Sequence, residues 1–136
     1  MPATVSEPAV GRGSMLRRGV LAVVGATVAN AAVLAAVRAS GLVAPFPALQ
    51  YLPVALFTAA GAVGATVVYG FLAARSDAPD RRFVELAAVV LVLSVLPDIA
   101  LLSVDPMATV GGVVVLMALH VVAAVVIVAT LLGRWP

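Results

Sequence analysis

The sequence predicts an all-α integral membrane protein, folded as a bundle of four transmembrane helices with short loops. Of its 136 residues, 64% are hydrophobic and only 10% are charged, and the mean hydropathy is +1.22. Soluble domains are usually about half apolar and about a quarter charged. A hydrocarbon core about 30 Å thick takes ~20 helical residues per crossing, so four crossings account for nearly the whole chain. The lipid bilayer is therefore its expected solvent.

The first predicted span covers about 18–38. Residues 1–16 mix proline, glycine and polar side chains, a composition that buries little apolar surface and predicts a flexible N-terminal tail. Arg17 and Arg18 then precede an uncharged apolar run that ends at Arg38. An arginine pair also begins many secretory signals, but this run is longer than the ~7–15 apolar residues of a signal. We expect an uncleaved first helix.

Turn-forming residues bound the other three spans. Ser40–Gln50 contains Gly41 and two prolines, which predict a short connection whose apolar side chains dip into the membrane interface. Arg75–Arg82 carries turn formers and both charge signs, and predicts a loop in water. Asp105 or Thr109 can cap the start of the last helix. These boundaries predict one transmembrane domain over 17–133, with further spans at about 51–74, 83–103 and 109–132.

The arginines fall unevenly between the two sides of the predicted bundle. Arg38 alone lies on one side, and seven lie on the other: Arg12, Arg17, Arg18, Arg75, Arg81, Arg82 and Arg134. Arginine-rich segments beside membrane spans stay on the cytoplasmic side. The sequence therefore predicts a multi-pass protein of the cell membrane with both termini in the cytoplasm.

The span 83–103 is unusual because its apolar run contains a carboxylate, Asp98, next to a proline, Pro97. An ionisable group in hydrocarbon must find a partner or a watery cavity, and is by default a candidate functional position. Pro97 is expected to free a backbone carbonyl one turn earlier. We predict a polar core in which Asp98 contacts His120 or Arg38. The candidate polar core, or ligand or proton site, comprises Asp98, His120, Asn30, Ser94 and Arg38.

Each of these residues also has a purely structural interpretation. Asp98 lies about one and a half turns from the end of its span, so it can reach outward or pair with Arg38 as a structural tie. His120 is the single histidine of a chain without cysteine, and one ligand cannot build a usual zinc site. An interhelical hydrogen bond is its simpler role. Asn30 is typical of interhelical bonds, which contribute ~0.6 and up to ~2 kcal/mol.

Small residues four apart indicate where helices approach one another closely, either within the bundle or in a homodimer. The pairs are Gly25 with Ala29 and Gly61 with Ala65. The chain has no phosphate-binding loop, zinc-protease motif or serine-hydrolase motif, and one histidine cannot supply bis-histidine heme ligation. Its basic clusters also lack interleaved aromatics. No catalytic residue, cofactor, metal ion or nucleic-acid partner is predicted.

Four features carry a resemblance to a known family. They are the Arg17-Arg18-Gly-Val-Leu-Ala-Val-Val start with Asn30, the arginine-rich loop leading to Phe83, the Ser94-Val-Leu-Pro97-Asp98 segment, and Met117-Ala-Leu-His120-Val-Val-Ala. Over about Arg17–Leu132 the chain resembles a family of small four-helix membrane proteins that is known only as a domain of unknown function, DUF6069. The resemblance implies this fold and a membrane location, and brings no activity or catalytic residues with it.

Two functions fit these observations. The first is a non-enzymatic protein that acts through helix packing, as a homo-oligomer or as an accessory subunit of a larger membrane complex. The alternative is a small transporter or ligand-binding bundle that uses Asp98 and His120 within the membrane. A membrane enzyme is a third and weaker interpretation, because the spans offer one candidate acid and one candidate base.

Overall fold

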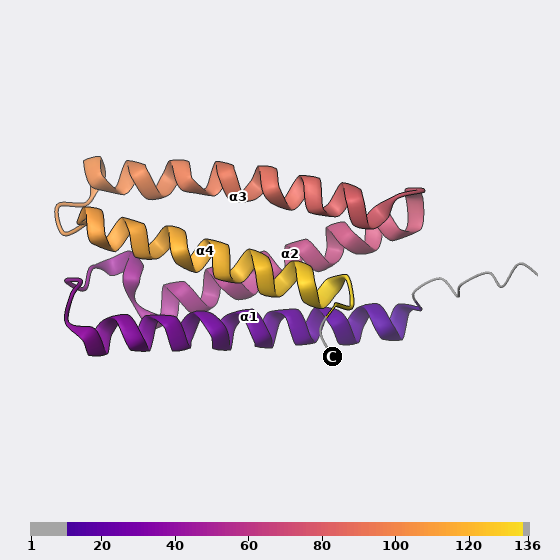
Figure 1. The fold of residues 1–136 in the computed structure, drawn as a ribbon, viewed down its shortest axis with the longest axis horizontal. Helices are drawn as coiled ribbons and strands as arrows, with labels where there is room; N and C mark the ends of the chain where they lie inside the picture. The colour runs from indigo at the N-terminus through magenta and orange to yellow at the C-terminus, as the bar shows by residue number, and fades with distance from the viewer. Residues whose placement is uncertain (1–10, 135–136) are drawn as a thin grey trace, which may run out of the picture.

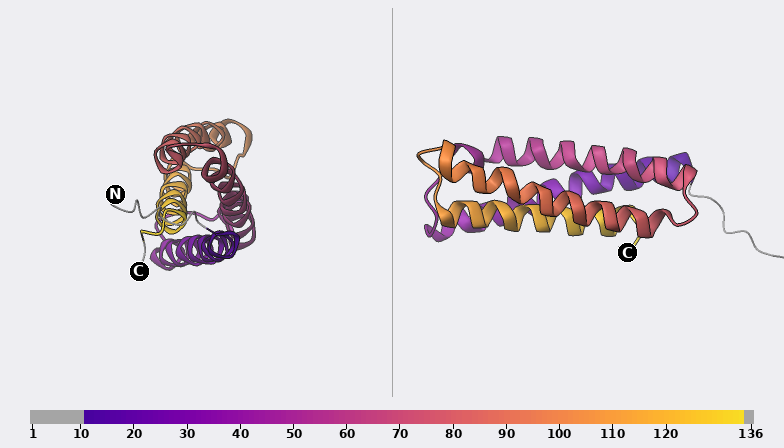
Figure 2. Two further views of the ribbon diagram at one scale, coloured as in Figure 1. Left: turned by 90° about the vertical axis from the view of Figure 1, so that its right-hand side faces the viewer. Right: turned by 90° about the horizontal axis from the view of Figure 1, so that it is seen from above.

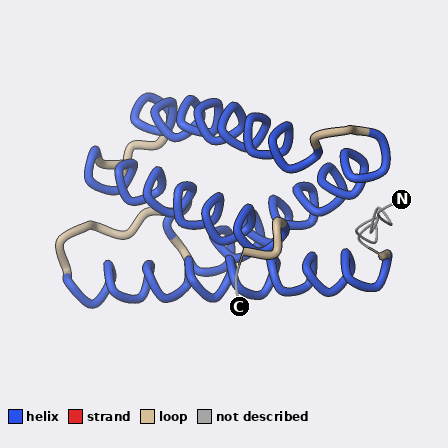
Figure 3. Tube along the Cα trace, turned by 45° about the vertical axis from the view of Figure 1, so that its right-hand side comes forward, coloured by secondary structure: helices blue, strands red, loops and turns tan. Residues whose placement is uncertain are grey.

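The computed structural model describes residues 11–134 (Figure 1). Within this range the chain forms four long helices and one short 3-10 turn, η1, and the loops between them are short (Figure 3). Each long helix is long and apolar enough to cross a membrane, which confirms the all-α class and four helices of membrane-spanning length. The elements are α1 (Arg12–Ser40), η1 (Pro47–Leu49), α2 (Tyr51–Arg75), α3 (Pro79–Val104) and α4 (Val110–Leu131).

The four helices form a bundle in which consecutive helices run in opposite directions (Figure 1). α1 packs against α2 and α4, and α3 packs against α4 and, less extensively, α2. The end-on view in Figure 2 shows this four-sided arrangement. The start of α1 and the end of α4 therefore lie at the same end. We call it the arginine end, because seven of the eight arginines lie there, and we call the opposite end the strap end.

Two helices begin earlier than predicted. α1 starts at Arg12, so the described part of the predicted tail is helical, whereas residues 1–10 lie outside the described range. Adding residues to an existing helix is easier than starting one, so a long apolar span can extend into polar flanking sequence. α3 starts at Pro79, with Asp80 in its first turn, both favoured at a helix N-terminus. The predicted loop over 75–82 is thereby reduced to three residues.

The other boundaries follow the expected local chemistry. Thr109 caps α4, because its Oγ1 accepts a hydrogen bond from the Gly112 N–H at 3.1 Å. The Asp105 carboxylate instead accepts the Met107 N–H at 2.9 Å and stabilises the turn before α4. α1 ends at Ser40, and the Gly41 that follows it has a φ of 66°, the left-handed conformation that glycine adopts readily.

Two apolar clusters form the buried core. The arginine-end cluster consists of Ala22, Ala26, Ala62, Tyr69, Phe83, Ile127 and Leu131. The strap-end cluster consists of Leu34, Phe46, Leu49, Val54, Leu116 and Leu119. α1, α2 and α4 each contribute buried residues to both clusters. α3 contributes a buried residue, Phe83, to the arginine-end cluster only. The core of the bundle is thus two apolar layers along its length.

The connection Gly41–Gln50, which we call the strap, closes the strap end of the bundle. Phe46, held between two prolines, is only 1% exposed and packs in the strap-end cluster. Its ring occupies the place that a side chain at Gly112 would need. The prediction that the apolar side chains of the strap enter the interface is wrong for Phe46, because Gly112 leaves room for its ring inside the bundle. Leu42, by contrast, is 87% exposed.

α3 is the least buried helix of the bundle. Phe83 near its start and Asp98 near its end are its only buried residues. Most of its valines and leucines face outward, which suits contact with lipid acyl chains but leaves few packing contacts to hold the helix.

Adding a methyl group at Gly112 tests whether the Phe46 ring packs against this glycine. We expect Gly112→Ala to lower the free energy of unfolding by about 1–3 kcal/mol, because the new Cβ would overlap the Phe46 ring. Gly111→Ala, one residue earlier, is the matched control. A Cβ there meets only ordinary contact, 3.8 Å from Val43, so the change should be neutral or mildly stabilising. Unfolding in detergent, followed by circular dichroism, measures both; equal stabilities would show that Phe46 lies elsewhere.

Candidate functional site: a polar layer between two apolar clusters

A layer of polar side chains separates the two apolar clusters. On each helix, the polar residues lie between a residue of one cluster and a residue of the other, where Leu101 counts as a residue packed against the strap-end cluster. The bounding pairs are Ala26 and Leu34 on α1, Val54 and Ala62 on α2, Phe83 and Leu101 on α3, and Leu119 and Ile127 on α4. Every helix contributes at least one. The polar layer consists of Thr27, Asn30, Thr58, Asp98 and His120.

Asp98 and His120 join α3 to α4 within this layer. The His120 Nδ1 lies 2.9 Å from the Asp98 Oδ2, so of the two partners predicted for Asp98, His120 and Arg38, the structure places His120 beside it. The carboxylate is the inner member of the pair, since the Asp98 side chain is 8% exposed and the His120 side chain 40% exposed. A buried acid in a membrane span needs such a partner, because hydrocarbon offers neither water nor counter-ion.

The surroundings of His120 favour the tautomer that carries its proton on Nδ1. Nδ1 lies 2.9 Å from the backbone oxygen of Leu116 as well as 2.9 Å from the Asp98 carboxylate. A nitrogen between two oxygens must carry hydrogen, because its lone pair would otherwise be repelled by both. That single N–H is aligned with the Leu116 carbonyl, which leaves Asp98 Oδ2 without a well-directed hydrogen bond.

Asn30 belongs to a second polar contact, which joins α1 to α2. Its Nδ2 donates to the Thr58 Oγ1 at 2.9 Å, and Asn30 is only 2% exposed. No hydrogen bond links Asn30 to Asp98 or His120 among the described residues. The single cluster predicted around Asp98 is therefore divided into two pairs at similar depth. The Asn30 Oδ1 and the Thr27 Oγ1 are buried and have no hydrogen-bond partner among these residues.

Ser94 and Arg38 were predicted to belong to the polar core, but they lie outside the polar layer. The Ser94 hydroxyl donates to the Leu91 carbonyl of its own helix at 2.6 Å, a bond that serine commonly makes within helices. Arg38 lies at the strap end, with its guanidinium carbon 5.1 Å from the centre of the Tyr51 ring. The long arginine side chain can reach the interface there, so it does not pair with Asp98. Pro97 leaves α3 helical throughout.

Sequence reasoning missed the polar contacts at the arginine end. The Tyr69 hydroxyl donates to the Asp80 carboxylate at 2.6 Å, which ties α2 to the start of α3. The Arg18 guanidinium donates to the Leu131 carbonyl at 3.0 Å and so binds the end of α4, where a cation favours the helix dipole. Asp80 lies in the segment that was predicted to be a loop in water, so nothing in the sequence indicated its hydrogen bond with Tyr69.

Neither hollow found at the two ends of the bundle is lined by the polar layer. One lies beside the strap and Arg38, and the other beside Arg81, Glu85 and Arg134 at the arginine end. The described residues also contain no group of three or more metal-ligating His, Asp or Glu side chains. The chemistry available within the span is therefore one carboxylate, one imidazole and unpartnered neutral oxygens.

The family model for a family of unknown function, DUF6069, matches residues 10–135. The chain belongs to DUF6069. The match covers nearly the whole sequence, and it confirms the resemblance carried by the motifs around Asn30, Asp98 and His120. Comparisons with curated proteins and with solved structures give no match for this DUF6069 chain. Since the family has no assigned function, the activity of the protein has to be argued from its polar layer.

A double-mutant cycle on Asn30→Ala and Thr58→Val tests the contact between α1 and α2. We expect a coupling free energy of ~0.6 kcal/mol or more, up to about 2 kcal/mol, because each single change leaves the other buried group without its partner. Unfolding in mixed detergent measures the cycle. In the matched control cycle, Thr130→Val takes the place of Thr58→Val. Thr130 is a buried threonine whose hydroxyl donates to the Val126 carbonyl of its own helix. Coupling as large with Thr130→Val would contradict a specific Asn30–Thr58 bond.

Proposed function

We propose that this DUF6069 protein is a non-enzymatic membrane protein that binds and releases a proton at the Asp98–His120 pair, acting as a small transporter or ligand-binding bundle. The observation that carries the proposal is the 2.9 Å contact between a buried carboxylate and an imidazole inside a membrane-spanning bundle. Ionisable residues within spans mark ion and proton pathways because they are otherwise too costly to keep there.

The charge of the pair depends on a single proton. Histidine is the side chain that can change its charge between pH 5 and 8. With a proton on both ring nitrogens, His120 neutralises Asp98 and the pair has no net charge. Loss of the Nε2 proton leaves one negative charge among apolar helices, which favours entry of a proton or of a cationic or hydrogen-bond-donating ligand. α3 holds Asp98 with few other contacts, so the pair governs how α3 packs on α4.

The non-enzymatic part of the proposal rests on the small set of reactive groups in the layer. Asp98 and His120 give one acid and one base, and the neighbouring threonines engage no base among the described residues. An activated nucleophile needs a base within hydrogen-bond reach. A binding or transport role uses the pair as it stands.

A second candidate function is helix packing with another chain, as a homo-oligomer or an accessory subunit. The observation that favours it is on α2, where Gly61 and Gly64 are exposed and a Cβ at either would meet nothing within 4 Å. Of the two alternatives predicted for Gly61, contact within the bundle is therefore wrong, and contact with another chain stays a prediction. Exposed glycines on a membrane helix suit close approach of another helix.

We also propose that the arginine end faces the cytoplasm, which places both termini there. Seven arginines at that end against Arg38 at the strap end support this orientation. The strap and the turn at Met107 would then face the outside of the cell membrane.

Removing the charge from either member of the pair tests the proton-binding function. We expect Asp98→Asn and His120→Gln each to abolish the pH dependence, between pH 5 and 8, of uptake or ligand binding by reconstituted protein. The reason is that either change removes the group whose proton the pair shares. Glu85→Gln is the control, because Glu85 pairs with Arg81 at the surface, 3.0 Å away. An unchanged pH profile in both layer variants would rule out the proposal.

Cysteine labelling in intact cells tests the orientation, and the chain is suited to it because it contains no cysteine. We expect Met107→Cys, at an exposed turn of the strap end, to react with a membrane-impermeant maleimide. Ala78→Cys, in the exposed loop between α2 and α3, should react only after the cells are opened. Both residues lie outside the helices and the polar layer. The reverse pattern would place the termini outside the cell.

A further inference from the structure

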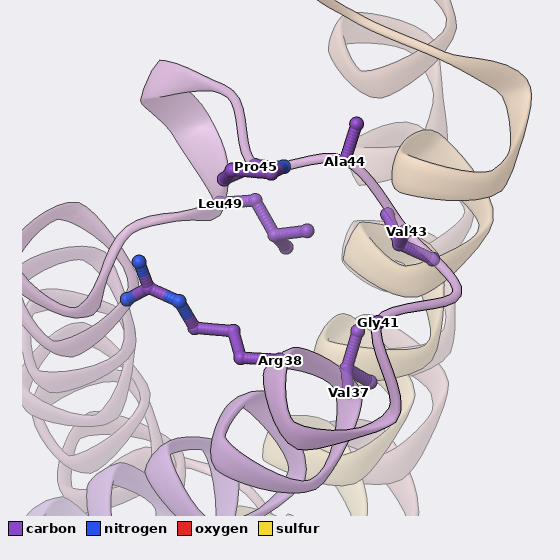
Figure 4. Close-up of a pocket in the computed structure, with 7 residues that line it drawn as sticks. All are labelled: Val37, Arg38, Gly41, Val43, Ala44, Pro45 and Leu49. Carbon is purple, nitrogen blue, oxygen red and sulfur yellow. The ribbon is translucent and has the colours of Figure 1, made fainter.

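A hollow of about 240 Å³ lies between the end of α1 and the strap (Figure 4). Its lining includes one charged side chain, Arg38, and the aliphatic or proline side chains of Val37, Val43, Ala44, Pro45 and Leu49. With ~30 Å³ for each water molecule, the hollow has room for several waters or for one small polar group. It combines a cation with apolar walls.

Arg38 has no acidic partner in the described part of the chain. The ion pairs there involve Arg81 and His120, whereas the Arg38 guanidinium stacks on the Tyr51 ring. An aromatic face orients a guanidinium but leaves its N–H donors free to bind an anion at their edge. The positive charge in the hollow is therefore available to a ligand.

Two residues of the strap that line this hollow have backbone N–H groups without a partner within residues 11–134. The backbone N–H groups of Val43 and Ala44, two of the lining residues, donate to no oxygen among the described residues. The strap makes few hydrogen bonds of its own in this stretch: the Leu42 N–H donates to the Ser40 hydroxyl, and the next backbone bond is from Leu49 to Phe46. A guanidinium together with unused N–H donors is the composition of an anion site.

We propose that this hollow binds the phosphate group of a membrane phospholipid. Arg38 lies in the last turn of α1, at the end of a membrane span, which is the depth of lipid headgroups. The apolar walls suit the ester and acyl portion of a lipid rather than free inorganic phosphate. Exposed leucines on the first turns of α2, Leu52 and Leu56, continue from Tyr51 into the span and offer a surface for an acyl chain.

The chain provides a matched control for Arg38. Arg75 is also exposed, also in the last turn of a helix, and also stacked on an aromatic ring, with its guanidinium carbon 4.8 Å from the centre of Phe71. It lines neither of the two hollows described above. Arg38→Gln and Arg75→Gln therefore remove the same charge and the same stacking contact, and differ in whether a hollow is present.

The test measures binding of phosphatidylglycerol to purified full-length protein by native mass spectrometry, with thermal unfolding in detergent as a second readout. We expect Arg38→Gln to weaken lipid binding at least tenfold and Arg75→Gln to change it less than twofold. Unliganded unfolding temperatures show whether each variant is folded.

Parallel titrations identify the ligand chemistry. We expect inorganic phosphate and decanoate each to bind wild-type protein much more weakly than phosphatidylglycerol, because one lacks the chain and the other the phosphate. Equal loss of lipid binding in the Arg38 and Arg75 variants would overturn the proposal, since it would show charge attraction alone. Decanoate binding as tight as lipid binding would overturn it as well.

Discussion

Polar groups inside a bilayer have no water to bind, and this constraint decides how the four helices face one another. Apolar helix surfaces gain little by choosing one another over acyl chains, so their hydrophobicity does not fix which side turns inward. The Asn30–Thr58 and Asp98–His120 contacts do fix it, because each brings together polar side chains that would otherwise face acyl chains. One contact sets α1 against α2, and the other sets α3 against α4.

Small residues determine how closely the oriented helices approach. A side chain at Gly19 would collide with Thr66 across the α1–α2 contact, and one at Gly112 would collide with Phe46 of the strap. Both glycines are buried next to one of the apolar clusters, one toward each end of the bundle. The polar layer thus sets helix rotation, while glycine sets helix distance on either side of it.

The sequence predicts the spans well because their signal is long and simple. Four apolar runs, the arginines at their ends and the Thr109 cap are local features that need no knowledge of neighbours. The partner of Asp98 could be narrowed in advance to His120 or Arg38, because a lone acid deep in a span has few possible partners. Thr58 could not be identified as the partner of Asn30, since threonines in helices usually bond their own backbone, as Thr66 and Thr130 do. The periodicity of a helix predicts which residues share one face, but it does not predict which residue of a neighbouring helix that face contacts.

The distribution of contacts along α3 makes Asp98 decisive for the position of that helix. Its start is tied to α2 by the Tyr69–Asp80 bond and by Phe83, whose ring centre lies 5.1 Å from that of Tyr69. From Val84 onward Asp98 is the only buried residue of α3, with Leu101 partly buried beside the strap-end cluster. Separation of Asp98 from His120 would therefore free the second half of α3 while leaving its start anchored. The Asn30–Thr58 contact lies on α1 and α2, so those two helices would keep their packing. A change of charge at the Asp98–His120 pair would therefore alter the packing of α3 and leave that of α1 and α2 unchanged.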